Sequence, residues 1–267
     1  MIIKKTKAIF IKLFSILGIF LAIKKKKKNN EYELINKKEW IPFLNGNEKT
    51  DLYKKCIEKT GQSKTNNFSK QLRFYNLMQL TEHVLKNKEL TKHNFAECGC
   101  WHGHSSLVIS SILKKNNFKN NFYIFDSFEE GLSEVKEQDK NLLENMTQDE
   151  VLKQKNYFKS NEAKVKDVLK PFEFVRILNG WIPRRFKEIS EQKFSFVHID
   201  VDMFQPTLDS LKFFFPRLEK NGIIICDDYN FSSFPGAKKA WDEYFKDKNN
   251  KFNLFYETPF GGCFIIK

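Results

Sequence analysis

One stretch, from Phe194 to Tyr229, restricts the fold of this chain more than any other part of the sequence. A short apolar run ends on Asp200, a helical pattern follows, and a second apolar run ends on Asp227 and Asp228. The helical part spaces its apolar residues three and four apart, at Leu208, Leu211, Phe215 and Leu218. Strand, helix and strand in this order predict a parallel βαβ unit in an open α/β sheet.

Acidic residues follow both predicted strands. The carboxyl edge of an open parallel sheet is where ligands bind, so Asp200, Asp227 and Asp228 are expected to converge there. Three acids without a basic partner repel one another, and their hard oxygen ligands suit Mg²⁺, Ca²⁺ or Mn²⁺. The alternative is that these residues cap helices or form turns, which Asp also favours.

A second pattern, at Asn94 to Ser106, predicts a strand, a glycine loop and the start of a helix. Gly99 and Gly103 allow a tight turn and close approach of a ligand to the backbone, as in nucleotide-cofactor sites. The loop is neither GxGxxG nor a phosphate-binding loop, so an ordinary turn remains the alternative. The next predicted strand, residues 121–125, ends on Asp126, at the point where an acid receives ribose hydroxyls in doubly wound folds.

Length and composition indicate a globular protein with a substantial core. The chain has 267 residues, of which 41% are apolar, enough for one α/β domain with extensions. Nine lysines and no acid lie in residues 1–30, so the rest carries only +4 of the net charge of +13. No nucleic-acid partner is therefore expected. Five cysteines without CxxC spacing predict buried thiols in a reducing compartment.

The first 28 residues predict a membrane-associating segment. Thirteen of the sixteen residues from Ala8 to Ile23 are apolar, and Lys24–Lys28 follow directly. Sixteen helical residues span about 24 Å, which is short for a hydrocarbon core of about 30 Å. We expect residues 1–28 to bind the inner face of the cell membrane and the domain to be cytoplasmic. The alternative is a helix that packs on the domain or on a partner.

The remaining chain divides into three expected regions. Residues 29–69 predict a linker with local helix, and residues 70–267 predict the main domain. Within it, residues 133–171 are long and charged, which predicts an inserted lid or substrate-side segment. Residues 252–256 and 263–266 predict a terminal antiparallel pair that closes the sheet edge.

Several short sequence motifs, in the order in which they occur along the chain, make it resemble one enzyme family. The order of βα units resembles class I methyltransferases that use S-adenosylmethionine. The strings themselves are similar to those of the macrocin/mycinamicin O-methyltransferase family over about residues 72–267: ECGCWHGHSS, FDSFEEGL, NGWIPRRF, FVHIDVDMFQPTLDSL, PRLEKNGIIICDDY and PGAKKAWDEYF. The resemblance implies a Rossmann-like, mostly parallel seven-stranded sheet with helices on both faces and a C-terminal antiparallel hairpin.

The resemblance also implies an activity and a site. It implies S-adenosylmethionine-dependent, Mg²⁺-assisted O-methylation of a hydroxyl on a sugar-containing small molecule or glycan. The implied metal ligands are Asp200, Asp227 and Asp228, with Asp200 also accepting the proton. The implied cofactor pocket comprises Glu97, Gly99, Trp101, Gly103, Ser105, Asp126 and Ser127. Asn179 departs from the family pattern, which has lysine there, and His198 is either an alternative base or a core histidine.

Three other functions stay open at this point. One is methyl transfer to a catechol-like hydroxyl, and another is an NAD-type oxidoreductase on the same fold. The third is a membrane-associated binding module without activity. A homo-oligomer also stays open.

Overall fold

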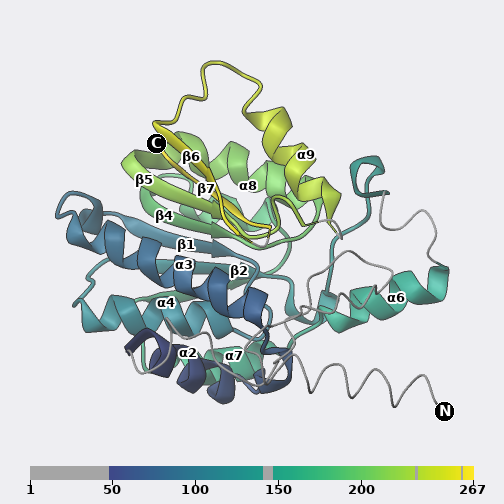
Figure 1. Cartoon of the computed structure of the whole chain (residues 1–267), viewed down its shortest axis with the longest axis horizontal. Helices are drawn as coiled ribbons and strands as arrows, with labels where there is room; N and C mark the ends of the chain where they lie inside the picture. Colours follow the sequence, from purple (N-terminus) through teal and green to yellow (C-terminus); the bar gives the residue numbers. More distant parts are fainter. Residues whose placement is uncertain (1–47, 141–146, 232–233, 260) are drawn as a thin grey trace, which may run out of the picture. The chain divides into compact units, whose positions relative to one another are not determined.

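The computed structural model describes residues 48–267 except 141–146, 232–233 and 260. These residues belong to one compact unit, Ile41–Lys267. Its sheet has seven strands in the order β3-β2-β1-β4-β5-β7-β6 (Figure 1). The strands are β1 Asn94–Cys98, β2 Phe122–Asp126, β3 Val175–Asn179, β4 Phe194–Ile199, β5 Leu218–Cys226, β6 Leu254–Glu257 and β7 Cys263–Ile266. Strands β1 to β5 pair in parallel and β7 pairs antiparallel with β5 and β6, so the predicted architecture is confirmed.

Two helical layers cover the sheet. The helices are α2 Glu48–Lys59, α3 Phe68–Lys86, α4 His104–Lys115, α6 Gln148–Tyr157, α7 Glu162–Leu169, α8 Phe204–Arg217 and α9 Pro235–Tyr244. Figure 1 shows α8 and α9 on one face, and α3, α4, α2 and α7 on the other. Every residue of the central strands β1 and β4 is buried. Burial on both faces is why neither strand shows a regular alternation of apolar and polar residues.

The domain begins earlier than the sequence predicted. Helix α2 lies inside the expected linker 29–69, yet it packs against α3 and α4. Its side chains Tyr53, Cys56 and Ile57 are at most 3% exposed. An apolar face of this size has to be buried, and the structure buries that of α2 against helices of the domain. Residues 29–47 lie outside the described residues.

The expected lid 133–171 consists of two different parts. Helix α7 packs on α4 and buries Val165 and Leu169, so it is the helix that connects β2 to β3. Helix α6 instead exposes Leu152 and Tyr157 and extends away from the sheet in Figure 1. The lid prediction therefore applies at most to the part of the segment that precedes α7.

Strand β5 is longer than predicted. The helical spacing in the sequence extends to Leu218, but α8 ends at Arg217 and β5 begins at Leu218. Leu218 pairs with Phe194 of β4, and Asn221 N donates to Lys267 O at 2.8 Å. These pairings hold the backbone in the sheet, with Asn221 in the left-handed region at φ 66°.

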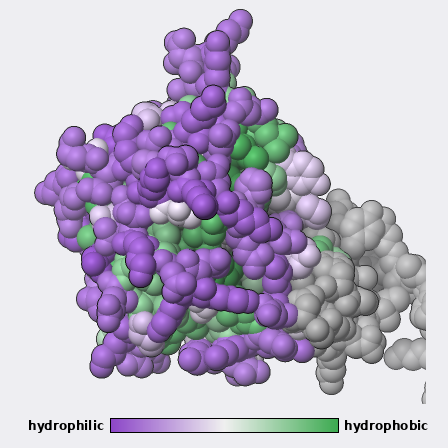
Figure 2. Space-filling view, turned by 90° about the vertical axis from the view of Figure 1, so that its left-hand side faces the viewer, coloured by the Kyte–Doolittle hydropathy of each residue, from purple (hydrophilic) through white to green (hydrophobic). Residues whose placement is uncertain are grey.

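The surface of the domain is mostly hydrophilic on the side shown in Figure 2, where hydrophobic patches lie between hydrophilic residues. Among the described helices, none is both long enough and apolar enough to cross a membrane. The segment 1–28, on which the membrane prediction rests, lies outside the described residues, so that prediction is not tested.

Candidate functional site

The carboxyl ends of β1, β4 and β5 place the predicted acids side by side. Asp200 N donates to Cys98 O at 2.8 Å, and Asp227 N donates to Ile199 O at 2.9 Å. The three strands therefore stay paired as far as the acids that follow them. Ligand atoms of Asp200, Asp227 and His198 all lie within 4.8 Å of one another.

His198 connects this group to the core. It lies opposite Glu97 in the register of β1 and β4, and its Nδ1 is 2.9 Å from Glu97 Oε1. The Ser106 hydroxyl donates to the other oxygen of Glu97. On its far side, His198 Nε2 lies 3.9 Å from Asp227 Oδ1. Burial alone would lower the pKa of His198, but the neighbouring carboxylates of Asp227 and Glu97 raise it to about 10.

Arg73, from α3, is part of the site, although the sequence analysis did not predict it. Its Nη1 donates to Asp227 Oδ2 in a largely buried ion pair. Burial favours the neutral form of Asp227, but the charge of Arg73 and the nearby imidazole of His198 lower its pKa to about 2. Lys70 lies one helical turn earlier and donates to Thr65 Oγ1 at 2.6 Å. Two cations on the buried side of a helix that also carries Phe74 and Leu77 are the signal that could have revealed this.

The third expected ligand, Asp228, is outside this group of three. Its Oδ2 accepts from Asp202 N at 3.1 Å, and Asp202 has a left-handed φ of 60°. Asp228 thus fixes the turn that follows Asp200. Burial and then neighbouring carboxylates raise the pKa of Asp202 and of Asp228 well above the usual range. Burial and the charge of Asp227 raise the pKa of Asp200 to about 6.

The donor set suits a divalent cation. Two carboxylates offer hard oxygen atoms, and an imidazole completes the group. His198 turns its other ring nitrogen to a carboxylate, the arrangement that orients metal-binding histidines in proteins. The residues present therefore fit the cation that the family resemblance implies.

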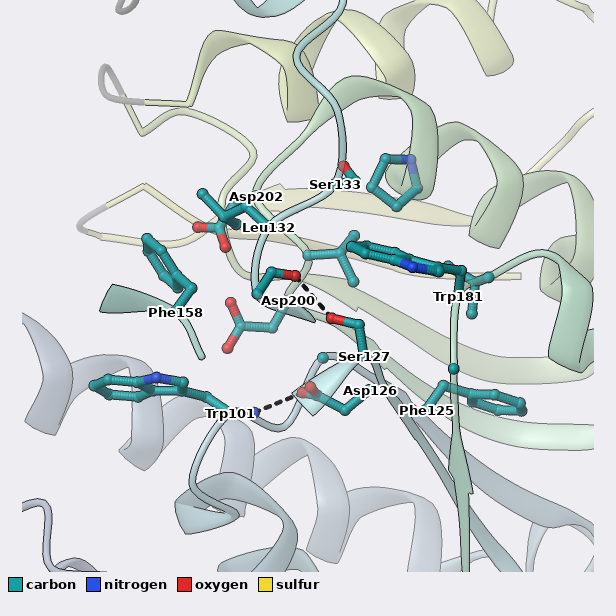
Figure 3. Close-up of a pocket in the computed structure, with 16 residues that line it drawn as sticks. Trp101, Phe125, Asp126, Ser127, Leu132, Ser133, Phe158, Trp181, Asp200 and Asp202 are labelled. Carbon is teal, nitrogen blue, oxygen red and sulfur yellow. Dashed lines mark hydrogen bonds between the residues drawn. The ribbon is translucent and has the colours of Figure 1, made fainter. Parts of the chain in front are cut away.

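A cavity opens beside Asp200 and encloses about 570 Å³, including space open to solvent. Figure 3 shows Trp181 on one side of the cavity and Phe158 with Asp202 on the opposite side. The lining residues are Gly99, Trp101, Phe125, Asp126, Ser127, Gly131, Leu132, Ser133, Phe158, Gly180, Trp181, Ile182, Asp200, Val201, Asp202 and Pro206.

Asp126 holds the loop that follows β1. Its carboxylate accepts from the backbone N–H groups of Cys100, Trp101 and Phe128 at 2.6–2.8 Å. Burial raises the pKa of Asp126, and these three donors counteract that rise only in part. The loop is tightly packed, because a Cβ added to Gly99 (φ +83°) would lie 1.8 Å from Asp200 O. Only glycine fits at this position.

The expected cofactor residues separate into two groups. Gly99, Trp101, Asp126 and Ser127 line the cavity. Glu97 is fully buried and bound to His198, Gly103 packs under Val165 of α7, and Ser105 is 6% exposed in the first turn of α4. The second group supports the cavity from behind instead of lining it.

The family assignment comes from comparison with known proteins. Residues 47–256 match the family described as Macrocin-O-methyltransferase (TylF). The chain belongs to this family. The match covers most of the chain and confirms the resemblance found in the sequence strings. It begins at α2, in agreement with the domain boundary in the structure.

Two curated O-methyltransferases are similar in sequence. One is demethyldecarbamoylnovobiocin O-methyltransferase from Streptomyces niveus, 26% identical over 185 residues, 64% of each chain. The other, from Streptomyces olivaceus, is 8-demethyl-8-(2,3-dimethoxy-alpha-L-rhamnosyl)-tetracenomycin-C 4'-O-methyltransferase. It is 26% identical over 165 residues, which are 59% of this chain and 60% of that protein. The chain thus matches less than two thirds of the length of these relatives.

Solved structures agree on the fold. The O-methyltransferase NovP superposes with a TM-score of 0.58 at 21% identity, covering 74% of this chain and 80% of that one. CalS11, a calicheamicin methyltransferase, gives a TM-score of 0.57 at 15% identity, covering 90% and 99%. This protein therefore has the class I methyltransferase fold.

Proposed function

We propose that this protein transfers a methyl group from S-adenosylmethionine to a hydroxyl of a sugar or glycosylated molecule, assisted by a divalent cation such as Mg²⁺. The observation that carries the proposal is the position of Asp200. Its carboxylate belongs both to the group that could hold a cation and to the lining of the cavity. The two curated relatives, both named as O-methyltransferases of glycosylated compounds, support the choice of acceptor.

The chemistry requires a proton acceptor next to the reacting oxygen. When bound, S-adenosylmethionine would supply the methyl group and the cation would stabilise negative charge on the acceptor oxygen. Three carboxylates line the cavity, but Asp126 is held by three N–H donors and Asp202 has a strongly raised pKa. Asp200 is therefore the residue that we propose takes the proton.

The other side chains position the reactants. Gly99, Trp101, Asp126 and Ser127 would hold the cofactor along the end of β1 and β2. Trp181 and Phe158 form apolar walls on opposite sides of the cavity (Figure 3), which limits the access of water to the reaction. Asp200, Asp227 and His198 would hold the cation, and Glu97 would orient His198.

The test is methyl transfer by the purified full-length chain with radiolabelled S-adenosylmethionine and a panel of glycosides, nucleotide sugars and catechols. We expect label in sugar-containing acceptors, loss of transfer in a chelator, and recovery with Mg²⁺. Transfer only to catechols would contradict the acceptor class. Absence of S-adenosylmethionine binding, together with binding of NAD, would restore the oxidoreductase alternative.

A further inference from the structure

The ion pair between Arg73 and Asp227 has a consequence for the cation site. Arg73 Nη1 holds Asp227 Oδ2, while Asp227 Oδ1 faces His198 Nε2 at 3.9 Å. This second distance is too long for a hydrogen bond, so Oδ1 is directed toward the candidate ligand group without a strong partner. A cation bound by Asp227 and a guanidinium on the same carboxylate would repel each other at close range in a buried site.

The guanidinium of Arg73 is anchored through one carboxylate. Within the described part of the chain, its one hydrogen-bond partner is Asp227, and its Nε is buried without a partner. The side chain is 23% exposed, so it borders solvent. A residue that serves only to orient a ligand is normally fixed by several bonds, whereas this one can leave Asp227 without breaking any other bond.

We propose that Arg73 competes with the divalent cation for Asp227 and thereby sets the affinity of the site for metal. The proposal rests on the metal-assisted reaction proposed above and adds a control of that reaction by α3. Arg73 neutralises the acidic cluster, and the cation has to displace it from Asp227. Binding of metal is thus coupled to a movement of the Arg73 side chain.

Lys70 provides a matched control. It lies on the same helix and carries the same charge, and it interacts electrostatically with Asp200 and Asp227. Its Nζ, however, donates to Thr65 Oγ1 and does not contact the carboxylates. Removing Lys70 changes the field at the site, whereas removing Arg73 changes the field and also frees the Asp227 oxygen.

The experiment measures Mn²⁺ affinity by calorimetry on the full-length protein, without acceptor or S-adenosylmethionine. We expect Arg73→Met and Arg73→Gln to bind Mn²⁺ at least about tenfold more tightly than the wild type. We expect Lys70→Met to change the affinity by less than about threefold. Asp200→Asn in the Arg73→Gln background should abolish the gain, which places the bound Mn²⁺ at this site.

Several results would overturn the proposal. They are equal or weaker Mn²⁺ binding by both Arg73 variants, an equal gain in Lys70→Met, and no Mn²⁺ binding by any variant. Thermal unfolding checks that the variants are folded, and Arg73→Gln keeps an N–H donor for Asp227 in case Arg73→Met does not fold. Because the readout is binding, a protein that fails to transfer methyl groups would still give a result.

Discussion

Glu97 on β1 and His198 on β4 form a buried pair in the centre of the sheet, with Glu97 Oε1 2.9 Å from His198 Nδ1. Glu97 is fully buried and His198 is 2% exposed. The pair joins the core to Asp227, whose Oδ1 lies 3.9 Å from the other ring nitrogen. The sheet interior and the candidate cation site are thus electrostatically connected through one imidazole.

The first prediction is that Glu97→Gln destabilises the fold. Removing one member of a buried charged pair leaves the other uncompensated, which costs about 3–5 kcal/mol. The amide oxygen of Gln can still accept a hydrogen bond, so we expect the lower end of this range. The free energy of unfolding, measured by urea denaturation at neutral pH, should fall by about 3 kcal/mol. Glu89→Gln is the control, because Glu89 pairs with Lys92 on the surface and should matter little.

The pH dependence gives a second readout for this variant. His198 has a folded pKa raised from 6.5 to about 10, so between these values the native state keeps a proton that the unfolded state has lost. The stability due to His198 is therefore complete below pH 6.5 and falls as the pH rises toward 10. Glu97→Gln should flatten this decline in chelator-treated protein. An unchanged slope would show that Glu97 does not hold the proton on His198.

The sequence predicts those parts of the site whose residues lie on strands joined by a single helix, and it does not predict contacts between distant segments of the chain. Asp200 and Asp227 were predictable because one crossover helix joins their strands, which makes the strands neighbours. Arg73 was not, since its contact with Asp227 spans 154 positions and depends on how α3 lies across the sheet. The side-chain direction of Asp228 was also not predictable, because it is set by the left-handed turn at Asp202.

The second prediction concerns the loop after β1. Asp126→Ala removes the acceptor of three backbone N–H groups, so both the loop and the proposed ribose contact should be lost. Hydrogen bonds to a charged group contribute about 1.5–3 kcal/mol, so we expect S-adenosylmethionine affinity to fall at least about tenfold. Calorimetry measures this, with Asp149→Ala on the exposed side of α6 as control. Unchanged affinity would contradict the assignment of Asp126 to the cofactor site.

The third prediction uses His104, which is 4% exposed and stacks on Phe74 with ring centroids 4.0 Å apart. Burial, with a smaller effect of Lys70, lowers its pKa from 6.5 to about 2. Below pH 6.5, His104 binds a proton in the unfolded state but stays neutral in the native state. The free energy of unfolding therefore falls as the pH falls. The slope is about 1.4 kcal/mol per pH unit, or about 2 kcal/mol lost by pH 5.

His104→Phe should remove this part of the acid sensitivity while keeping an aromatic ring in the cluster. Urea denaturation at pH 5 and pH 7 measures the difference between the two free energies of unfolding. The exposed His83, replaced by Phe in the same way, should leave that difference unchanged. Equal acid sensitivity in wild type and His104→Phe would show that other groups cause it.

The fourth prediction concerns residues 1–28. The apolar run 8–23 and the five lysines that follow should bind anionic membranes, with each lysine near the surface contributing about 1 kcal/mol. Replacing Lys24–Lys28 with Gln should therefore reduce flotation with phosphatidylserine vesicles and leave binding to neutral vesicles unchanged. A control with five Lys→Gln changes at exposed lysines of the domain should float like the wild type. Equal flotation of both variants would place the membrane contact elsewhere.

The last prediction separates the roles of two neighbouring carboxylates in the proposed reaction. Asp200→Asn removes a ligand and the proposed proton acceptor, so turnover should fall by about 10²-fold or more at any Mg²⁺ concentration. Asp228→Asn keeps an oxygen that can accept from Asp202 N, so the turn should persist. It removes a carboxyl group that can ionise beside a bound cation, so it should raise the Mg²⁺ concentration needed, and excess Mg²⁺ should restore most of the activity.

Methyl-transfer rates against Mg²⁺ concentration for wild type and both variants measure the difference, with a chelator as control. Rescue of Asp200→Asn by Mg²⁺ would show that Asp200 only holds the cation and that another residue takes the proton. Full activity of the wild type in chelator would refute the metal-assisted mechanism. The fold and the proposed cofactor would survive that result, because neither the sheet nor the contacts of Asp126 depend on a cation.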